Sequence, residues 1–225
     1  MSLLLAKPPV IAAWTLIAHA SAGAGGINGS TPVPAVTPPI DTTGANLLIV
    51  NGGAYYYDQA PPIDLHDNMG NTFTGAIFEY GGFVAGQCFM WYTYNPVVGP
   101  NHIFTYAAWV GGVTVAAFAG ASASPLGQTN SNYSNASNQL SISPGPITPV
   151  SNNVLIFTGV TNQNQEDLID SGFTVIDTVP WVEGMTLSQS GAYLTQPVAA
   201  TVSPTWSWAQ PDSVSAAVIA SFHHS

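Results

Sequence analysis

The sequence predicts an all-β protein, a β-sandwich preceded by an extended N-terminal arm. Two observations lead to this class. Apolar runs of strand length recur between clusters of glycine, proline and asparagine, and helical periodicity is nearly absent. The composition agrees, because the 225 residues include 22 glycines and 18 prolines beside a 46% apolar fraction. This composition is typical of many short strands joined by turns.

Residues 1–45 are expected to be an arm and linker with a first strand near residues 14–20. The start of the chain is similar to a signal peptide, but it lacks a basic n-region and Pro8-Pro9 interrupts it, so we expect a retained arm. Gly- and Pro-rich residues 23–41 favour extended backbone without ladder hydrogen bonds. The apolar side chains expected to lie in grooves of neighbouring subunits are Leu3, Leu4, Leu5, Val10 and Ile11.

Residues 46–225 are expected to form the sandwich. With the first strand, the predicted strands cover residues 14–20, 46–52, 72–80, 87–94, 102–109, 112–118, 153–159, 173–178, 191–198, 205–209 and 216–222. Such spacing is typical of sandwiches and barrels. Residues 112–118 are apolar on both faces, which predicts cover by a second sheet or by a neighbouring subunit. The Asn- and Ser-rich residues 122–149 are expected to be a surface excursion or an interface loop.

A short internal repeat supports two related halves. Residues 44–52 read GANLLIVNG and residues 151–159 read SNNVLIFTG, and in each segment a turn leads into an apolar strand. Two such strands suit the two halves of a jelly roll.

Four segments carry a family resemblance. They are DTTGANLLIV at 41–50, DNMGNTF at 67–73, YNPVVGPNHIFT at 94–105 and VAAFAG at 115–120. Residues 14–223, which contain them, resemble the concanavalin A-like jelly-roll domains of bacteriophage virion proteins and bacterial surface proteins. The resemblance implies a jelly-roll fold and a role in capsid decoration, in tail or fibre structure, or in glycan binding.

The charge balance excludes some partners. The chain has one basic and eleven acidic residues, a net charge of −10. One Lys cannot neutralise several phosphates, so nucleic acid and anionic membrane surfaces are excluded as partners. No apolar run is long enough for a membrane helix.

The same shortage of charge predicts assembly. Sheet edges are commonly protected by Lys, Glu or Pro, and Lys is missing from every predicted strand. Neighbouring copies in a closed oligomer or a lattice would cover such edges. We expect a homo-oligomer, and we expect a trimer from the resemblance and from the threefold positions that capsids offer.

A cluster of oxygen-bearing side chains follows the second predicted strand. Asp64, Asp67 and Asn71, with Asp58 nearby, are the candidate ligands for calcium, which binds six to eight hard oxygens. The alternative is a tight turn over residues 67–71 in which Asp and Asn bond their own backbone and Gly70 has a positive φ. No other metal or cofactor is expected.

Aromatic residues are the candidate glycan site. Trp206 and Trp208 stand two apart, so on a strand they project from one face, and Tyr56 belongs to a run of three tyrosines. Sugar rings stack on such side chains. The alternative is that both indoles pack in the core or in a subunit interface.

No residue set suggests an enzyme. The single cysteine, Cys88, lies in an apolar run and is expected to be a buried thiol. The glutamates Glu79, Glu166 and Glu183 have no recognisable catalytic setting. We therefore expect a non-enzymatic virion protein, a capsid decoration or cement protein held by major capsid or other virion proteins. The alternative is a lectin-like module of a tail fibre or a bacterial surface.

Overall fold

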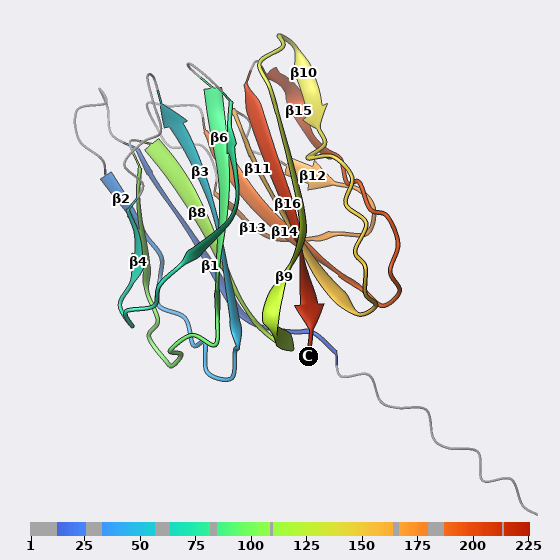
Figure 1. The fold of residues 1–225 in the computed structure, drawn as a ribbon. Helices are drawn as coiled ribbons and strands as arrows, with labels where there is room; N and C mark the ends of the chain where they lie inside the picture. The colour runs from blue at the N-terminus through green and yellow to red at the C-terminus, as the bar shows by residue number, and fades with distance from the viewer. Residues whose placement is uncertain are drawn as a thin grey trace, which may run out of the picture.

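The structure, a computed structural model, describes residues 13–25, 33–56, 64–81, 85–108, 110–163, 167–179, 187–212 and 214–225. Every regular element in these ranges is a β-strand (Figure 1). The predicted all-β sandwich is confirmed. No helix in the described ranges is long and apolar enough to cross a membrane.

The first eight strands form one half of the molecule. They are β1 (Thr15–Gly25), β2 (Val33–Val36), β3 (Leu47–Tyr56), β4 (Asp64–Asp67), β5 (Thr74–Tyr80), β6 (Ala85–Tyr94), β7 (Phe104–Ala108) and β8 (Val110–Ala119). A five-stranded antiparallel sheet has the order β1-β8-β3-β6-β5, and a small sheet has the order β2-β7-β4. We call this unit the N-terminal half.

The last eight strands repeat this arrangement. They are β9 (Ala121–Ser134), β10 (Gln139–Ile142), β11 (Val154–Asn162), β12 (Asp167–Ile169), β13 (Thr174–Val179), β14 (Ser188–Gln196), β15 (Trp206–Asp212) and β16 (Ser215–His224). The large sheet, read from β9, has the order β9-β16-β11-β14-β13, and the small sheet is β10-β15-β12. Each position corresponds to a strand eight places earlier, so the C-terminal half is a structural duplicate of the N-terminal half.

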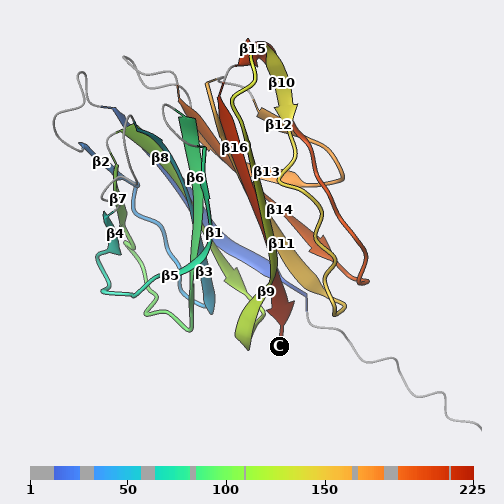
Figure 2. The ribbon, with the colours of Figure 1, turned by 45° about the horizontal axis from the view of Figure 1, so that its top comes forward.

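The four sheets stack as four layers, with the two large sheets in the middle (Figures 1 and 2). Three hydrophobic clusters hold the layers together. The central cluster, which includes Leu47, Phe118 and Phe157, lies between the large sheets. The outer clusters lie between each large sheet and its small sheet. Each half is therefore a sandwich, and the two sandwiches share a central core.

The large sheets are related by a pseudo-twofold arrangement. Strand β1 lies against β13 and β5 lies against β9, while β8 faces β14 and β6 faces β16. Exchanging the two halves converts the contact between β1 and β13 into that between β9 and β5, and the contact between β8 and β14 into that between β16 and β6. Strands β3 and β11, which are equivalent, face each other, so the axis passes between them. Isologous contacts of this kind are those of a symmetric dimer, here within one chain.

The register confirms the equivalence residue by residue. In the N-terminal half, Phe118 pairs with Leu47 on one side and Leu16 on the other. In the C-terminal half, Phe222 pairs with Leu155 and with Leu126. The edge strands also share a bulge, between Gly75 and Ile77 in β5 and between Val175 and Asp177 in β13.

The short repeat seen in the sequence belongs to β3 and β11, so it marks equivalent strands. Its letter-by-letter alignment is shifted by one residue, however. It matches Leu47 with Val154, but Leu47 faces the central core and Val154 faces the outer core. Because side chains alternate along a strand, a shift of one residue exchanges the two faces. The structural match of Leu47 is Leu155.

Within each half, the pairs β1 with β8, β2 with β7 and β3 with β6 are nested as expected in a jelly roll, as are their counterparts eight strands later. A fourth nested pair, β4 with β5, is not formed between the described strands, because β5 pairs with β6. Three of the four nested pairs that a jelly roll would have are therefore present, and the innermost pair, β4 with β5, is not, so the sandwich is open on that side.

Two expectations about loops need correction. The strand expected near residues 14–20 is present as β1, but β2 lies within the segment expected to be a linker, and a boundary at residue 45 separates no units. The expected excursion over residues 122–149 contains β9, a long edge strand paired with β16, and the short β10. Its polar residues fit an edge strand with one solvated face. The candidate arm residues Leu3, Leu4, Leu5, Val10 and Ile11 lie outside the described residues.

The strand predicted over 112–118 is covered on both faces, as expected. Its residues Val113 and Val115 pack in the outer core of the N-terminal half, and Ala116 and Phe118 pack in the central core. The face of this strand that carries Ala116 and Phe118 is covered by the C-terminal half of the same chain rather than by a neighbouring subunit.

At the pseudo-axis, equivalent residues differ in size. The counterpart of Asn51 is Gly159, and the Asn51 side chain lies where a Cβ on Gly159 would be. Two residues further along the strands, Gly53 corresponds to Thr161, and a Cβ on Gly53 would meet the Thr161 hydroxyl. Large and small residues thus alternate across the axis, which lets the two strands pack closely.

Candidate functional site

The two tryptophans expected to stack on sugars are inside the C-terminal half. Trp206 is 0% exposed and Trp208 is 5% exposed, and both belong to the outer core between the large and small sheets. Their N–H groups are also satisfied, because Trp206 Nε1 donates to Thr158 Oγ1 at 3.1 Å and Trp208 Nε1 donates to the Gln139 carbonyl at 3.0 Å. Neither indole can bind a sugar, so the glycan assignment at these residues is wrong and the packing alternative holds. Tyr56 ends β3, and its side chain lies outside the described residues.

The calcium candidates form a turn. Asp67 Oδ1 accepts the backbone N–H groups of Met69 and Asn71, and Asp67 Oδ2 accepts from Asn71 Nδ2 and His102 Nε2. Gly70 has a φ of +77°, as expected for the turn alternative. Both oxygens of the Asp67 carboxylate therefore accept two hydrogen bonds each from the protein, so neither is free to bind a cation.

Asp64 does not join this group. It is exposed and bonds His66 at 3.1 Å. The described residues contain no group of three or more His, Cys, Asp and Glu side chains that could hold a metal ion. The arrangement at Asp64, Asp67 and Asn71 gives calcium no site.

His102 joins the Asp67 turn to a second turn. Its Nε2 lies 2.9 Å from Asp67 Oδ2 and its Nδ1 lies 2.9 Å from Thr42 Oγ1, and the ring stacks on Phe104. The order of hydroxyl, imidazole and carboxylate is similar to that of a hydrolytic triad. All three side chains are buried, so no substrate reaches the Thr42 hydroxyl, and the network acts as a clamp between turns.

Hydrogen bonding shifts the titration of this clamp. Burial alone would raise the pKa of Asp67, but the hydrogen bonds from His102 and Asn71 outweigh burial and lower that pKa to about 2. The carboxylate is therefore charged at any pH above the strongly acidic range.

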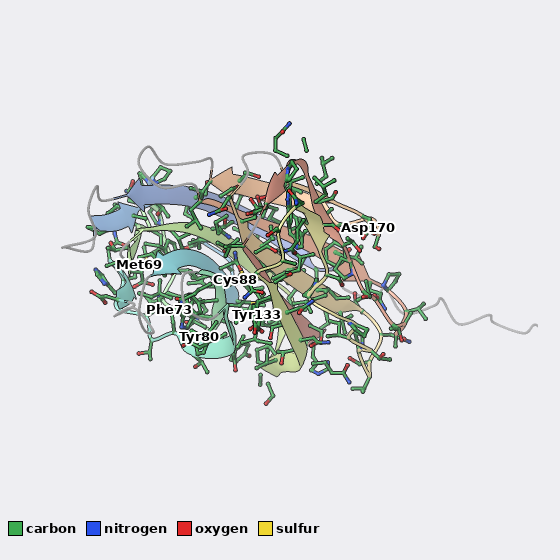
Figure 3. The ribbon with its side chains drawn as sticks, turned by 90° about the horizontal axis from the view of Figure 1, so that it is seen from above. Met69, Phe73, Tyr80, Cys88, Tyr133 and Asp170 are labelled. Atoms are coloured by element: carbon green, nitrogen blue, oxygen red, sulfur yellow. The ribbon has the colours of Figure 1, made fainter. Side chains whose placement is uncertain are left out.

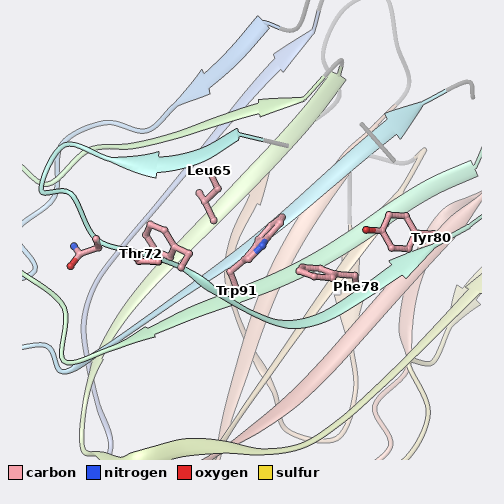
Figure 4. A pocket seen from close by; sticks show the side chains of 7 residues that line it. Leu65, Thr72, Phe78, Tyr80 and Trp91 are labelled. Carbon is pink, nitrogen blue, oxygen red and sulfur yellow. The ribbon is translucent and has the colours of Figure 1, made fainter. Parts of the chain in front are cut away.

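An open cleft lies on the side of the N-terminal half where β4 and β5 do not pair. It has a volume of about 510 Å³ and is lined mainly by aromatic and apolar side chains, namely Leu65, Phe73, Phe78, Tyr80 and Trp91, with Asn71 and Thr72 at one end. We call it the aromatic cleft. Figure 4 shows Leu65, Phe78, Tyr80 and Trp91 along this opening. Seen from above, Phe73 and Tyr80 lie in the N-terminal half and Asp170 lies far from them in the C-terminal half (Figure 3).

The rings of the cleft support one another. Phe78 lies against Trp91 and Phe89 with centroid distances of 5.4 and 5.8 Å, and Tyr80 lies 5.3 Å from Phe89. Gly75 makes room for this arrangement, because a Cβ there would meet the Phe78 ring. Phe78 is 42% exposed and Tyr80 is 45% exposed. Two fixed aromatic rings thus face solvent beside a buried indole.

Two further aromatic side chains lie at and behind the cleft. Trp91 is 9% exposed and lines the cleft with its indole ring. Behind it, the Tyr106 hydroxyl is fully buried and has no hydrogen-bond partner among the described residues, and its ring lies 6.0 Å from that of Trp91. Burial raises the pKa of Tyr106 far above its usual range, so the phenol keeps its proton. Pockets that combine an apolar wall with a few polar groups are typical ligand sites.

Asn71 takes part as a support. Its Nδ2 donates to Asp67 and to the Val97 carbonyl, and its Oδ1 accepts the Val97 N–H. These bonds fix the end of the cleft to the Asp67 turn. A ligand's polar contacts would therefore come from Trp91, Tyr80 and Thr72.

The equivalent place in the C-terminal half is different. By register, Phe78 corresponds to Thr178, Phe89 to Ser190 and Trp91 to Ala192. The space holds a buried carboxylate, Asp167, which accepts from Ser190, Ser188 and Asn162. Desolvation raises the pKa of Asp167 above its ordinary value.

The acidic and thiol groups considered for catalysis lie elsewhere. Glu79 is on β5 between Phe78 and Tyr80, so its side chain points to the opposite face of the strand. Burial raises the pKa of the Cys88 thiol to about 12, which makes it the inert buried cysteine that was expected. Glu166 and Glu183 lie outside the described residues.

Sequence reasoning missed the cleft residues Phe73, Phe78, Tyr80 and Trp91. One signal was available, since Phe78 and Tyr80 stand two apart on a predicted strand, as Trp206 and Trp208 do. No family model, curated protein or solved structure matches the chain.

Proposed function

We propose that the protein is a non-enzymatic carbohydrate-binding protein and that the aromatic cleft is its binding site. The observation that carries this proposal is the exposure of Phe78 and Tyr80 beside the Trp91 indole in a cleft lined by no charged side chain. Exposed rings supply a flat apolar surface for the C–H face of a sugar, and the indole and phenol groups can bond its hydroxyls. This moves the lectin-like alternative from Trp206 and Trp208 to the other half.

The ligand class follows from charge. The cleft is lined by no charged side chain, and the chain carries a net charge of −10. An acidic sugar would meet an unfavourable field and no cation to pair with. The sugar is therefore neutral.

A titration followed by tryptophan fluorescence tests the proposal. Neutral and acidic glycans are added to the wild type, to Tyr80→Ala and to Tyr133→Ala, whose exposed tyrosine on β9 lines no part of the cleft. We expect a neutral glycan to bind the wild type and Tyr133→Ala equally, and Tyr80→Ala about tenfold more weakly or worse, a loss of at least about 1.4 kcal/mol. Equal binding by all three proteins would refute the site.

A second candidate is a structural role in a virion, as a capsid decoration or cement protein or as part of a tail fibre. The supporting observation is the edge of the large sheets. On β1 the described side chains include no Lys, Arg, Asp or Glu, and a hydrogen bond of 2.7 Å between His19 and Asp177 joins β1 to β13. An edge of this kind is open to pairing with another chain.

Sedimentation separates this candidate from a free lectin. A structural role predicts a homo-oligomer, with a trimer as the expected form, at low micromolar concentration. Thr15→Lys, at an exposed position of the edge strand β1, should weaken that assembly, because a charge on an edge strand opposes pairing. A stable, well-dispersed wild-type monomer contradicts the structural role and leaves the glycan proposal intact.

A further inference from the structure

A second groove lies on the other side of β5 from the aromatic cleft, near the start of that strand. Tyr92, which lines it, packs against the central core, whereas Trp91 and Phe73 of the cleft pack in the outer core. The second groove has a volume of about 360 Å³ and is lined by residues from the segment before β5 and from β5, β6 and β9, among them Thr72, Thr74, Thr93, Tyr94 and Ser124. Thr72 also lines the aromatic cleft. The two hollows therefore meet at one residue.

The ridge between the hollows is fixed. The Thr93 hydroxyl donates to the Thr72 carbonyl at 2.7 Å, which holds the segment before β5 against β6. Phe73, the next residue, packs on the outer-core side with the Phe104 ring 6.3 Å away. A ligand that crosses the ridge thus passes a rigid edge rather than a loop that must be ordered first, which lowers the cost of binding.

The second groove has the chemistry of the first with more hydroxyl groups. Tyr94 is 38% exposed and supplies an aromatic surface, and several threonine and serine hydroxyls surround it. No charged side chain lines either hollow. Both hollows suit the same kind of neutral, hydroxyl-rich ligand.

We propose that the ligand is an extended neutral oligosaccharide that fills both hollows at once and crosses the chain at Thr72. This rests on the proposed carbohydrate binding and adds that the protein reads several consecutive sugar units rather than one terminal sugar. Binding in the second groove becomes intramolecular once the first is occupied, so a chain long enough to reach Tyr94 gains affinity without new contacts at Tyr80.

A length series tests the inference. Linear cello-, xylo- and malto-oligosaccharides, from the disaccharide to the octasaccharide, are titrated calorimetrically into the full chain and into Tyr80→Ala, Tyr94→Ala and the control Tyr133→Ala. In the wild type and the control, affinity for the series that binds should rise with length and then level off. Tyr80→Ala should weaken every length, whereas Tyr94→Ala should weaken long chains roughly tenfold, about 1.4 kcal/mol, and leave the shortest binder unchanged.

A second variant keeps the test independent of the folding of Tyr94→Ala. Ser124 is exposed on β9 in the second groove, so Ser124→Trp fills the groove and should remove the length dependence in the same way. If Tyr80→Ala weakens binding while Tyr94→Ala and Ser124→Trp leave long chains unaffected, the extended site is overturned and the carbohydrate proposal stands. If no series binds the wild type, or if Tyr80→Ala has no effect, both are overturned. Tight binding of an unstructured peptide in place of every sugar would also overturn both.

Discussion

Phe118 and Tyr193 pack edge to face between the two halves, with ring centroids 5.4 Å apart. Their equivalents, Phe222 and Tyr92, repeat the contact at 5.9 Å with nearly the same interplanar angle. Each pair joins a strand of one half to a strand of the other. The central core is therefore built twice from the same two ring types, once on each side of the pseudo-axis.

This duplication predicts that the halves unfold together. Phe118→Ala and Phe222→Ala should each lower the free energy of unfolding by about 3–5 kcal/mol, because each removes a fully buried ring and leaves a cavity. Denaturant titration should show one transition in both variants. Two separate transitions, or a loss confined to the half that carries the change, would contradict a shared core.

The close approach of β3 and β11 predicts a coupled pair. Gly159→Ala should destabilise the protein by about 1–3 kcal/mol, because the new methyl group meets the Asn51 side chain. Adding Asn51→Ala should restore part of that loss. Measuring unfolding free energies for the two single variants and the double variant gives the coupling, and strictly additive effects would argue against this contact.

The Asp67 clamp predicts a loss of stability in acid. The pKa of Asp67 is lowered in the folded protein to about 2, so its contribution is present above the unfolded pKa, near 4, and disappears as the pH falls toward 2. Asp67→Asn should remove this part of the pH dependence. Thermal unfolding of wild type and variant between pH 5 and pH 2 checks it, with Asp64→Asn as the exposed control on the same strand.

Asp167 should make the stability change with pH in the opposite direction to Asp67. Desolvation raises its pKa in the folded protein, so the folded state holds this proton more tightly than the unfolded state does, and stability from this residue falls as the pH rises through the folded pKa. Asp167→Asn should flatten that fall above pH 4. Unfolding free energies at mildly acidic and neutral pH decide the sign, and a variant that loses more stability at neutral pH than in acid would contradict it.

Trp91→Phe isolates the hydrogen bond in the cleft. The change keeps an aromatic ring beside Phe78 and removes the indole N–H. Affinity for a neutral glycan should fall by about 0.5–1.5 kcal/mol, the net worth of an ordinary hydrogen bond, while thermal stability changes little. Unchanged affinity would place the ligand away from the indole nitrogen.

Much of the fold was predictable, because apolar runs bounded by turn residues mark strands. Every strand predicted from the sequence overlaps an observed strand. The strands that were missed are short, as β4 and β12 are, or polar, as β9 is. A polar edge strand pairs through its backbone, so its side chains carry little signal.

The site was less predictable, because two aromatic residues spaced two apart on a strand can be either buried or exposed. Trp206 and Trp208 stand two apart on β15, the middle strand of its small sheet, and are buried, whereas Phe78 and Tyr80 stand two apart on β5, an edge strand, and are exposed. Alternation tells which residues share a face but not what covers that face. Phe78 and Tyr80 stay uncovered because β5 pairs with β6 rather than with β4. No pattern in the sequence near β5 indicates which of these strands it pairs with.

The start of β1, the end of β16 and the turn between β8 and β9 lie close together at one end of the two large sheets. The Trp14 ring lies 5.4 Å from that of His224, and the Ser225 N–H donates at 2.9 Å to the carbonyl of Gly120, the one residue between β8 and β9. Either half could therefore come first in the chain without moving the strands. A circular permutant that begins at Ala121, runs to Ser225 and continues through a short linker into Ala13–Gly120 should reach the same native state, since no strand would have to change its neighbours.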